Sequence, residues 1–300
     1  MSNLTVPSLV RLHGVERSDR VATYVQVADI IARARQALFY EGMPATPNSP
    51  VGALFAQADR LDREWEAGAP SDDIETLMLA DEAARIADAV LEAIKQPDSR
   101  ESIRRITISD MRLSTRQPSQ GKDALWELDL MLFLRRRGAA VVFKDPPDLE
   151  LSLPGLTTPY GIACKKVYSE KSLNRQFSKG LKQLLPYAGA GLVAFNLDDL
   201  TPERSILQAS ARQDASDHLH QLNVAFIERH RRQFQKAVVA GRCDGIWIWS
   251  CVHADVRGLS PRFNRITEST IWRLSSSDHG VQSRIGKLKS VLDASRGLSG

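Results

Sequence analysis

Three short strand-like runs, separated by prolines, constrain the fold of this chain more than any other feature. They span residues 139–144, 148–153 and 160–167, and Asp145-Pro146-Pro147 and Leu153-Pro154-Gly155 divide them. Short runs rich in apolar and β-branched residues between turn residues predict strands, and such brief connections join antiparallel neighbours. The sequence therefore predicts a β-meander, which excludes an all-helical fold for this half of the chain.

Amphipathic patterns flank the meander and continue after it. Apolar residues recur at helical spacing over 121–137, and Gly138 ends this predicted helix. The later pattern predicts a helix at 170–187, a strand at 192–196, a helix at 215–240 and a strand at 244–252. Strands joined through helices tend to pair in parallel. The order αβββαβαβ therefore predicts an α/β fold in which a mixed sheet has flanking helices.

The chain before residue 118 has a different pattern. Helical periodicity over 18–42, 51–67 and 71–95 predicts three amphipathic helices. Residues 100–120 mix β-branched residues with Ser, Thr, Gln and Pro, which predicts a connecting strand and a linker. We therefore expect an all-α domain at 1–117 and an α/β domain at 118–300. Such a helical domain most often serves for packing or for contact with a partner protein, and the sequence leaves its role here unknown.

The two halves differ in the sign of their charge. Residues 1–117 hold 14 Lys and Arg against 18 Asp and Glu, whereas residues 118–300 hold 26 against 18. A basic half favours a polyanion such as nucleic acid, and a solvated surface is the alternative. The 3 widely spaced cysteines give neither a disulfide framework nor a zinc pattern. Because no run of about 18 apolar residues predicts a membrane span, we expect a cytoplasmic protein without membrane contact.

Acidic and basic residues follow the strand pattern of the meander. Side chains alternate along a strand, so Asp148 and Glu150 share a face of the second run, and Ala163 and Lys165 share a face of the third. If the meander pairs these strands, Asp148 and Lys165 converge. An acid beside a lysine can hold Mg²⁺ while the ammonium orients a hydroxide and stabilises the phosphate under attack. Glu127, on the preceding helix, is a further candidate ligand.

These residues, in this order, resemble the PD-(D/E)XK nuclease superfamily over roughly residues 120–253. The predicted order αβββαβ is that of the family's restriction-endonuclease-like core. The resemblance implies hydrolysis of DNA phosphodiester bonds with Mg²⁺ or Mn²⁺ as cofactor. It also implies that Asp148 is the family's Pro-Asp acid, that Lys165 is its motif lysine, and that Glu127 is its helical acid.

Two residues of the helix predicted at 170–187 extend the resemblance. Gln183 and Tyr187 are four residues apart, which places them on one face of a helix. They look like the glutamine–tyrosine motif of the RecB-like branch of the superfamily. The resemblance implies that the amide and the phenol position Lys165 or a substrate phosphate through hydrogen bonds.

The third strand departs from the family pattern. The family has an acid two residues before the motif lysine, and this chain has Ala163 there. Two hypotheses follow from this departure. In the first, Glu150 supplies the absent oxygen ligand from the same strand face as Asp148. In the second, the site has lost its metal and its activity.

Basic residues surround the predicted site. Four of them recur three or four residues apart on the helix at 170–187, which predicts a cationic stripe, and a solvated helix face is the alternative. Such a stripe neutralises phosphates without reading bases. The candidate nucleic-acid-binding residues are Lys166, Lys171, Arg175, Lys179 and Lys182.

The sequence therefore predicts a Mg²⁺-dependent deoxyribonuclease. Its predicted catalytic residues are Asp148, Glu150, Lys165, Gln183 and Tyr187, and its predicted metal ligands are Glu127, Asp148 and Glu150. A nuclease fold without catalysis that binds nucleic acid or a partner protein is the alternative from another class. A third hypothesis is a helical interaction protein whose C-terminal half is a scaffold.

Overall fold

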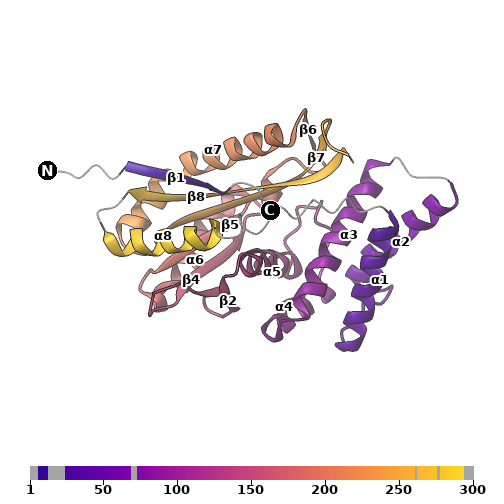
Figure 1. The fold of residues 1–300 in the computed structure, drawn as a ribbon, viewed down its shortest axis with the longest axis horizontal. Helices are drawn as coiled ribbons and strands as arrows, with labels where there is room; N and C mark the ends of the chain where they lie inside the picture. Colours follow the sequence, from indigo (N-terminus) through magenta and orange to yellow (C-terminus); the bar gives the residue numbers. More distant parts are fainter. Residues whose placement is uncertain (1–5, 13–23, 69–72, 261, 276–277, 294–300) are drawn as a thin grey trace. The chain divides into compact units, whose positions relative to one another are not determined.

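The computed structural model of this chain describes all residues except 1–5, 13–23, 69–72, 261, 276–277 and 294–300. The chain divides into two units. The sheet unit comprises Met1–Ser18, Phe133–Thr201 and Ser205–Gly300, and the helical unit comprises Asp19–Leu132 and Pro202–Arg204. N-terminal helices and a mixed sheet with flanking helices confirm the predicted α/β class (Figure 1).

The helical unit packs its helices around aliphatic and aromatic side chains. Ile31, Leu38, Phe55 and Ile86 are fully buried there, as expected for helices that each turn an apolar stripe inward. Asp73 begins one of the helices, since its carboxylate accepts a hydrogen bond from the Thr76 amide at 3.1 Å. The helices are α1 (Tyr24–Tyr40), α2 (Pro50–Glu66), α3 (Ile74–Ala93), α4 (Arg100–Ile108) and α5 (Gln120–Arg136), whose last turn lies in the sheet unit.

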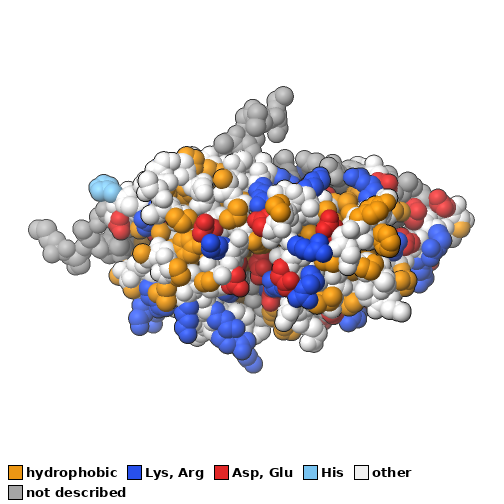
Figure 2. Space-filling view, turned by 90° about the horizontal axis from the view of Figure 1, so that it is seen from below, with side chains coloured by type: hydrophobic (Ala, Val, Ile, Leu, Met, Phe, Trp, Pro, Cys, Tyr) orange, Lys and Arg blue, Asp and Glu red, His pale blue; other side chains and the backbone are white. Residues whose placement is uncertain are grey.

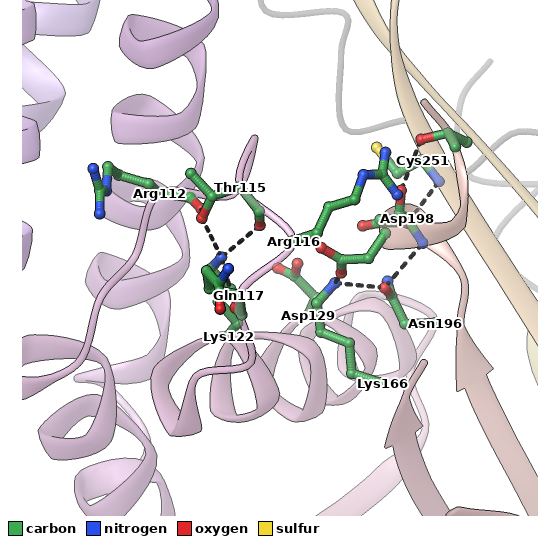
Figure 3. A network of polar contacts seen from close by, with 12 residues as sticks. Arg112, Thr115, Arg116, Gln117, Lys122, Asp129, Lys166, Asn196, Asp198 and Cys251 are labelled. Atoms are coloured by element: carbon green, nitrogen blue, oxygen red, sulfur yellow. Dashed lines mark hydrogen bonds and ion pairs between the residues drawn. The ribbon is translucent and has the colours of Figure 1, made fainter. Parts of the chain in front are cut away.

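The strand predicted within residues 100–120 is wrong. A 3₁₀ turn, η1 (Pro97–Ser99), leads into α4, which buries Ile103, Ile106 and Thr107. These residues lie at positions i, i+3 and i+4, so they share one side of a helix. The free energy gained by burying them together outweighs the β propensity of Ile and Thr. The following loop is anchored by the buried Lys122, whose Nζ donates to Thr115 O at 2.7 Å and Gln117 O at 3.1 Å (Figure 3).

The sheet has the strand order β1-β8-β7-β5-β4-β3-β2, and β6 pairs with β7 off this path. The predicted meander is β2 (Ala140–Phe143), β3 (Leu149–Ser152) and β4 (Tyr160–Lys166). β5 (Gly191–Asn196) pairs in parallel with β4, and β7 (Gly245–Val256) pairs in parallel with β5. The register pairs Glu150 with Gly161 and Gly161 with Gly191. This register brings Asp148, Glu150 and Lys165 to one part of the sheet.

The structure adds strands that the sequence analysis did not predict. They are β1 (Val6–Leu12), β6 (Ile206–Ala209) and β8 (Phe263–Ser275). β1 pairs antiparallel with β8 along its whole length, so residues 6–12 belong to the sheet. The division into units therefore differs from the predicted boundary at 117/118, because β1 joins the sheet unit and most of α5 stays with the helical unit.

Two helices cover one face of the sheet, α6 (Leu173–Gln183) and α7 (Arg212–Val239). Phe177 of α6 and Phe234 of α7 contact each other with ring centroids 5.2 Å apart, and both pack on Phe195 of β5. On the other face, Phe133 of α5 packs edge-on against Trp249 of β7 at 4.9 Å. The last of the described helices is α8 (His279–Asp293).

Among the described helices, none combines the length and the apolar character that crossing a membrane requires.

The close pairing of β4 with β5 predicts the effect of a small substitution. A Cβ at Gly191 would lie 2.2 Å from Gly161 O, so Gly191→Ala forces two paired backbones apart. We expect a loss of about 2–3 kcal/mol in the free energy of unfolding, the upper part of the range for overpacking. Urea denaturation measures it.

Gly286→Ala is the matched control. Gly286 lies on α8, and a Cβ there would meet no atom within 4 Å. Alanine is the better helix former by up to about 1 kcal/mol, so this variant is expected to be as stable as the wild type or more stable. An equal loss in the free energy of unfolding in Gly191→Ala and Gly286→Ala would contradict the close pairing of β4 with β5.

Candidate active site

The carboxylate of Asp148 is the centre of the site. Lys165 Nζ lies 2.7 Å from its Oδ2, and the Cys164 amide donates to the same oxygen at 2.6 Å. Gln183 Nε2 donates to Oδ1 at 3.0 Å. Asp148 and Lys165, which were predicted to converge if the meander pairs its strands, are therefore in direct contact.

Strand register explains this contact. β3 pairs antiparallel with β4, with Leu149 opposite Ile162 and Glu150 opposite Gly161. Continuing by one pair places Asp148 opposite Ala163, the position where the family pattern has an acid. Lys165 follows two residues later on the same face of β4. Ala163 is fully buried and belongs to the core formed with α6, so this face of the sheet is the one that α6 covers.

The predicted helix at 170–187 is interrupted at its ends. It consists of the 3₁₀ turn η2 (Glu170–Ser172), α6, and the 3₁₀ turn η3 (Leu185–Tyr187). Gln183 is the last residue of α6, and Tyr187 is the last residue of η3. Both residues still reach the predicted acids. Gln183 donates to Asp148, and the Tyr187 hydroxyl donates to Glu150 Oε2 at 2.5 Å. Asp148 and Glu150 therefore both face the segment that carries Gln183 and Tyr187.

Partial burial strengthens the contacts at Asp148. The side chains of Asp148 and Lys165 are 13% and 11% exposed, so water screens their attraction less than on an open surface. Burial, followed by the hydrogen bond to Glu150, raises the pKa of Tyr187 well above its ordinary value. The phenol therefore stays a hydrogen-bond donor at neutral pH.

Gly161 is a residue of the site that the sequence analysis missed. A Cβ at this position would lie 2.9 Å from Leu184 Cδ2, 3.2 Å from Pro147 Cγ and 3.4 Å from Tyr187 Cγ. The absence of a side chain lets Tyr187 lie over β4 and reach Glu150. A glycine inside a strand pattern is a signal for such a close approach, and Tyr160-Gly161-Ile162 contains this signal.

The site offers oxygen atoms suited to a hard cation. Besides the carboxylates of Asp148 and Glu150, Gln183 Oε1 is buried and has no hydrogen-bond partner among the described residues. Mg²⁺ is commonly held by one or two carboxylates and keeps several waters, so this donor set fits Mg²⁺ or Mn²⁺. Within the described parts of the chain, no group of three or more His, Cys, Asp and Glu side chains could hold a metal ion.

Glu127 lies on the part of α5 that belongs to the helical unit. Its Oε2 accepts a hydrogen bond from Arg105 Nη1 at 3.0 Å, and both side chains are largely buried. This pairing links α4 to α5. The role of Glu127 as a metal ligand stays a prediction.

Lys166 does not fit its predicted role in phosphate binding. It is buried, pairs with Asp199 and donates from Nζ to Asn196 Oδ1 at 2.9 Å (Figure 3). Because side chains alternate along β4, Lys166 points away from the face that Lys165 occupies. Its ammonium joins the end of β4 to the end of β5, so it is a structural cation.

The other predicted cations lie on the exposed side of η2 and α6. α6 buries Leu173, Phe177, Gly180 and Leu181 against the sheet. Basic side chains on the opposite side face solvent; they are Lys171, Arg175, Lys179 and Lys182. We call these four residues the cationic stripe. Figure 2 shows that Lys and Arg side chains also gather at several places on the face that it views.

No protein-family model, no curated protein and no solved structure matches this chain.

The hydrogen bond between Tyr187 and Glu150 predicts a pH-dependent difference in stability. At pH 7 we expect Tyr187→Phe to lower the free energy of unfolding by about 1–2 kcal/mol, since a hydrogen bond to a charged group is lost. The pKa of Tyr187 is raised in the folded protein, so above pH 10 the unfolded state loses its proton first. Wild-type stability then falls with rising pH.

The phenylalanine variant has no such ionisation at this position. The stability gap between wild type and Tyr187→Phe is therefore expected to narrow from pH 9 to pH 11, as measured by urea denaturation at each pH. A gap that stays constant or widens would contradict the burial and pairing of the phenol.

Proposed function

We propose that this protein is a metal-dependent nuclease that hydrolyses DNA phosphodiester bonds. The observation that carries the proposal is the contact of the Lys165 ammonium with the Asp148 carboxylate, held from the other side by Gln183. The observed order α5-β2-β3-β4-α6-β5 also supports it, because it is the order of the nuclease core that the motif residues resemble. The site carries the proposal, since one fold hosts many activities.

Asp148, Glu150 and Gln183 Oε1 would hold Mg²⁺ or Mn²⁺. When bound, such an ion polarises a phosphoryl oxygen and lowers the pKa of water. Gln183 and Tyr187 orient the two carboxylates, because each donates a hydrogen bond to one of them. The role of the helix residues is therefore to fix the acids before substrate binds.

Lys165 supplies a positive charge beside the acids. Its Nζ donates to Cys164 O at 2.7 Å as well as to Asp148, so the backbone of β4 holds the ammonium in place when the Asp148 oxygens are engaged elsewhere. An ammonium at this position orients the attacking water by hydrogen bonding and stabilises negative charge on the phosphate oxygens.

The cationic stripe supports a nucleic-acid substrate. Its four side chains are exposed on η2 and α6, the segment that ends at Gln183. Phosphates bound along these residues would lead the DNA backbone to Asp148. Affinity from such contacts does not depend on base sequence and falls steeply with salt.

A second candidate function has its own supporting observation. Ala163 lies opposite Asp148 and provides no carboxylate, and the described residues contain no group of three metal-ligating side chains. A site with fewer acidic ligands binds divalent cations more weakly. The second candidate is therefore a catalytically inactive nuclease-fold protein that binds nucleic acid or, through its N-terminal helices, a partner protein.

Cleavage assays separate the two candidates. We expect the wild type to cut plasmid, linear or single-stranded DNA with Mg²⁺ or Mn²⁺ and to stop when EDTA removes the metal. Asp148→Ala and Lys165→Ala are each expected to lower the cleavage rate by about 10²-fold or more, the effect of losing a group that acts in the transition state. Gel electrophoresis of the DNA measures the rate, and circular dichroism checks the fold of each variant.

The exposed ion pair of α4 provides the control. Arg104 Nη2 lies 2.7 Å from Glu101 Oε1, the same distance as between Lys165 Nζ and Asp148 Oδ2. The side chain of Arg104 is 53% exposed and that of Glu101 is 64% exposed. Glu101→Ala and Arg104→Ala are expected to cleave at the wild-type rate. Binding of DNA that is lost at high salt, without any cutting in either metal, would favour the inactive candidate and refute the nuclease.

Ala163→Glu tests the metal separately from activity. The register places this carboxylate beside Asp148 in a buried position, so without metal we expect the variant to lose about 3 kcal/mol or more of stability. Mg²⁺ should raise its melting temperature more than that of the wild type, since bound ligand stabilises the folded state. Differential scanning calorimetry with and without Mg²⁺ measures both effects.

Ala194→Glu gives the cost of a buried carboxylate away from the site. Ala194 of β5 is equally buried and faces the opposite side of the sheet from Val193 and Phe195, which belong to the core under α6 and α7. This variant is expected to lose stability with no recovery in Mg²⁺. If Ala163→Glu also shows no recovery, no cation binds beside Asp148.

A further inference from the structure

An exposed apolar side chain lies between two residues of the site. Leu185 is 66% exposed, and it is separated by one residue each from Gln183 and Tyr187, which hold Asp148 and Glu150. Other large apolar side chains are exposed in the described part of the chain, such as Phe39 and Val239. Scattered exposed residues of this kind are common, so the position of Leu185, and not its exposure alone, makes it informative.

The backbone around Leu185 fixes the direction of its side chain. The amides of Tyr187 and Gly189 both donate to Leu184 O, at 3.0 and 3.2 Å, and the Ala188 amide donates to Leu185 O at 3.0 Å. The side chain of Leu184 is fully buried. With Leu184 buried on one side and Tyr187 bonded to Glu150 on the other, the turn holds Leu185 towards solvent. An apolar side chain held in this way costs little further entropy when it contacts a ligand.

The surroundings of Leu185 indicate which ligand would cover it. The nearest residue of the cationic stripe, Lys182, is three positions away in the sequence, and Lys179 lies one turn of α6 earlier. Phosphates that contact these ammonium groups bring the bases of the same strand within reach of the turn. A nucleic-acid strand fits these surroundings, because it carries negative charges and apolar base faces side by side.

We infer that Leu185 inserts between neighbouring bases of a bound DNA strand, so that the protein selects single-stranded or locally unpaired DNA. This inference rests on the proposed function, since it takes DNA as the ligand. Apolar wedges such as leucine separate stacked bases in other DNA-binding proteins. Opening a stack requires less energy where the bases are already unpaired, so a fixed wedge favours such sites over intact duplex.

Binding measurements with the intact protein in EDTA test the inference without cleavage. Fluorescence anisotropy compares a single strand, a perfect duplex and a duplex with a central unpaired bubble that contains 2-aminopurine. We expect the wild type to bind the bubble about tenfold more tightly than the duplex, the scale of one base contact, and to raise the 2-aminopurine fluorescence. Leu185→Ala is expected to lose both the preference and the fluorescence rise.

Two further variants make the comparison specific. Leu185→Met keeps an apolar side chain and should keep the preference for the bubble. Val239→Ala removes an apolar side chain with the same exposed fraction, 66%, at the end of α7, and should also keep it. Circular dichroism checks that all variants are folded, which is expected because the substituted side chains are exposed.

The outcomes separate this inference from the proposed function. Cleavage of DNA with equal preference in wild type and Leu185→Ala would overturn the wedge and leave the nuclease. A preference that Leu185→Ala abolishes, without cleavage in Mg²⁺ or Mn²⁺, would support the wedge and refute hydrolysis. A wild type that binds all three DNAs equally overturns the wedge, and one that binds no DNA overturns both.

Discussion

The site depends on the carboxylate of Asp148, which is mostly withdrawn from water and held by groups from two other segments of the chain. Asp148 comes just before β3, Cys164 and Lys165 belong to β4, and Gln183 ends α6. A buried carboxylate without partners is strongly unfavourable. The folded state therefore needs the start of β3, the middle of β4 and the end of α6 together, and the interaction that gives the site its chemistry also fixes the local arrangement of these segments.

Small residues make this arrangement possible. Gly161 leaves room for Leu184, Pro147 and Tyr187 above β4, and Gly191 lets β5 approach the backbone of β4 at the same level. A methyl group at either position would meet neighbouring atoms at less than 3 Å. The turn that carries Gln183 and Tyr187 therefore lies close to the sheet because two paired strand positions lack side chains. The carboxylates of Asp148, just before β3, and of Glu150, within it, can then each receive a hydrogen bond from the same short segment.

Local patterns predicted the parts of the fold that are local in sequence. The meander, the helices α6 and α7, and the strands β5 and β7 all follow from periodicity and turn residues, and the alternation in β4 placed Lys165 on one face. β1 was missed because it becomes a strand by pairing with Ser269–Ser275 of β8, more than 250 residues away, and seven residues carry too little pattern to show this. Glu127 was grouped with Asp148 from its place on the preceding helix and by resemblance; the structure pairs it with Arg105, and its role as a metal ligand stays a prediction.

Lys165 and Lys166 also show that local sequence patterns do not predict contacts between distant parts of the chain. Adjacent lysines on a strand point to opposite faces, and the sequence alone does not say whether each face holds a ligand or a buried partner. Asp199 and Asn196, which receive Lys166, lie some thirty residues further along the chain at the end of the neighbouring strand. Lys166 is therefore bound inside the protein, and the stripe on η2 and α6 is what remains of the predicted phosphate-binding set.

Ala163 belongs to the core and to the site at once. It lies opposite Asp148, yet it is fully buried, and a Cβ at Gly180 of α6 would lie only 3.5 Å from its Cβ and 2.9 Å from Val193 Cγ1. A longer side chain at position 163 has to extend along β4 towards Asp148 or push α6 away from the sheet. Because α6 carries Gln183, moving it would also move the group that holds Asp148. Alanine at this position thus lets α6 pack closely on the sheet and keeps Gln183 in place to bond Asp148. Without an acid at position 163, Glu150 and Gln183 Oε1 are the oxygen donors that could bind a cation together with Asp148.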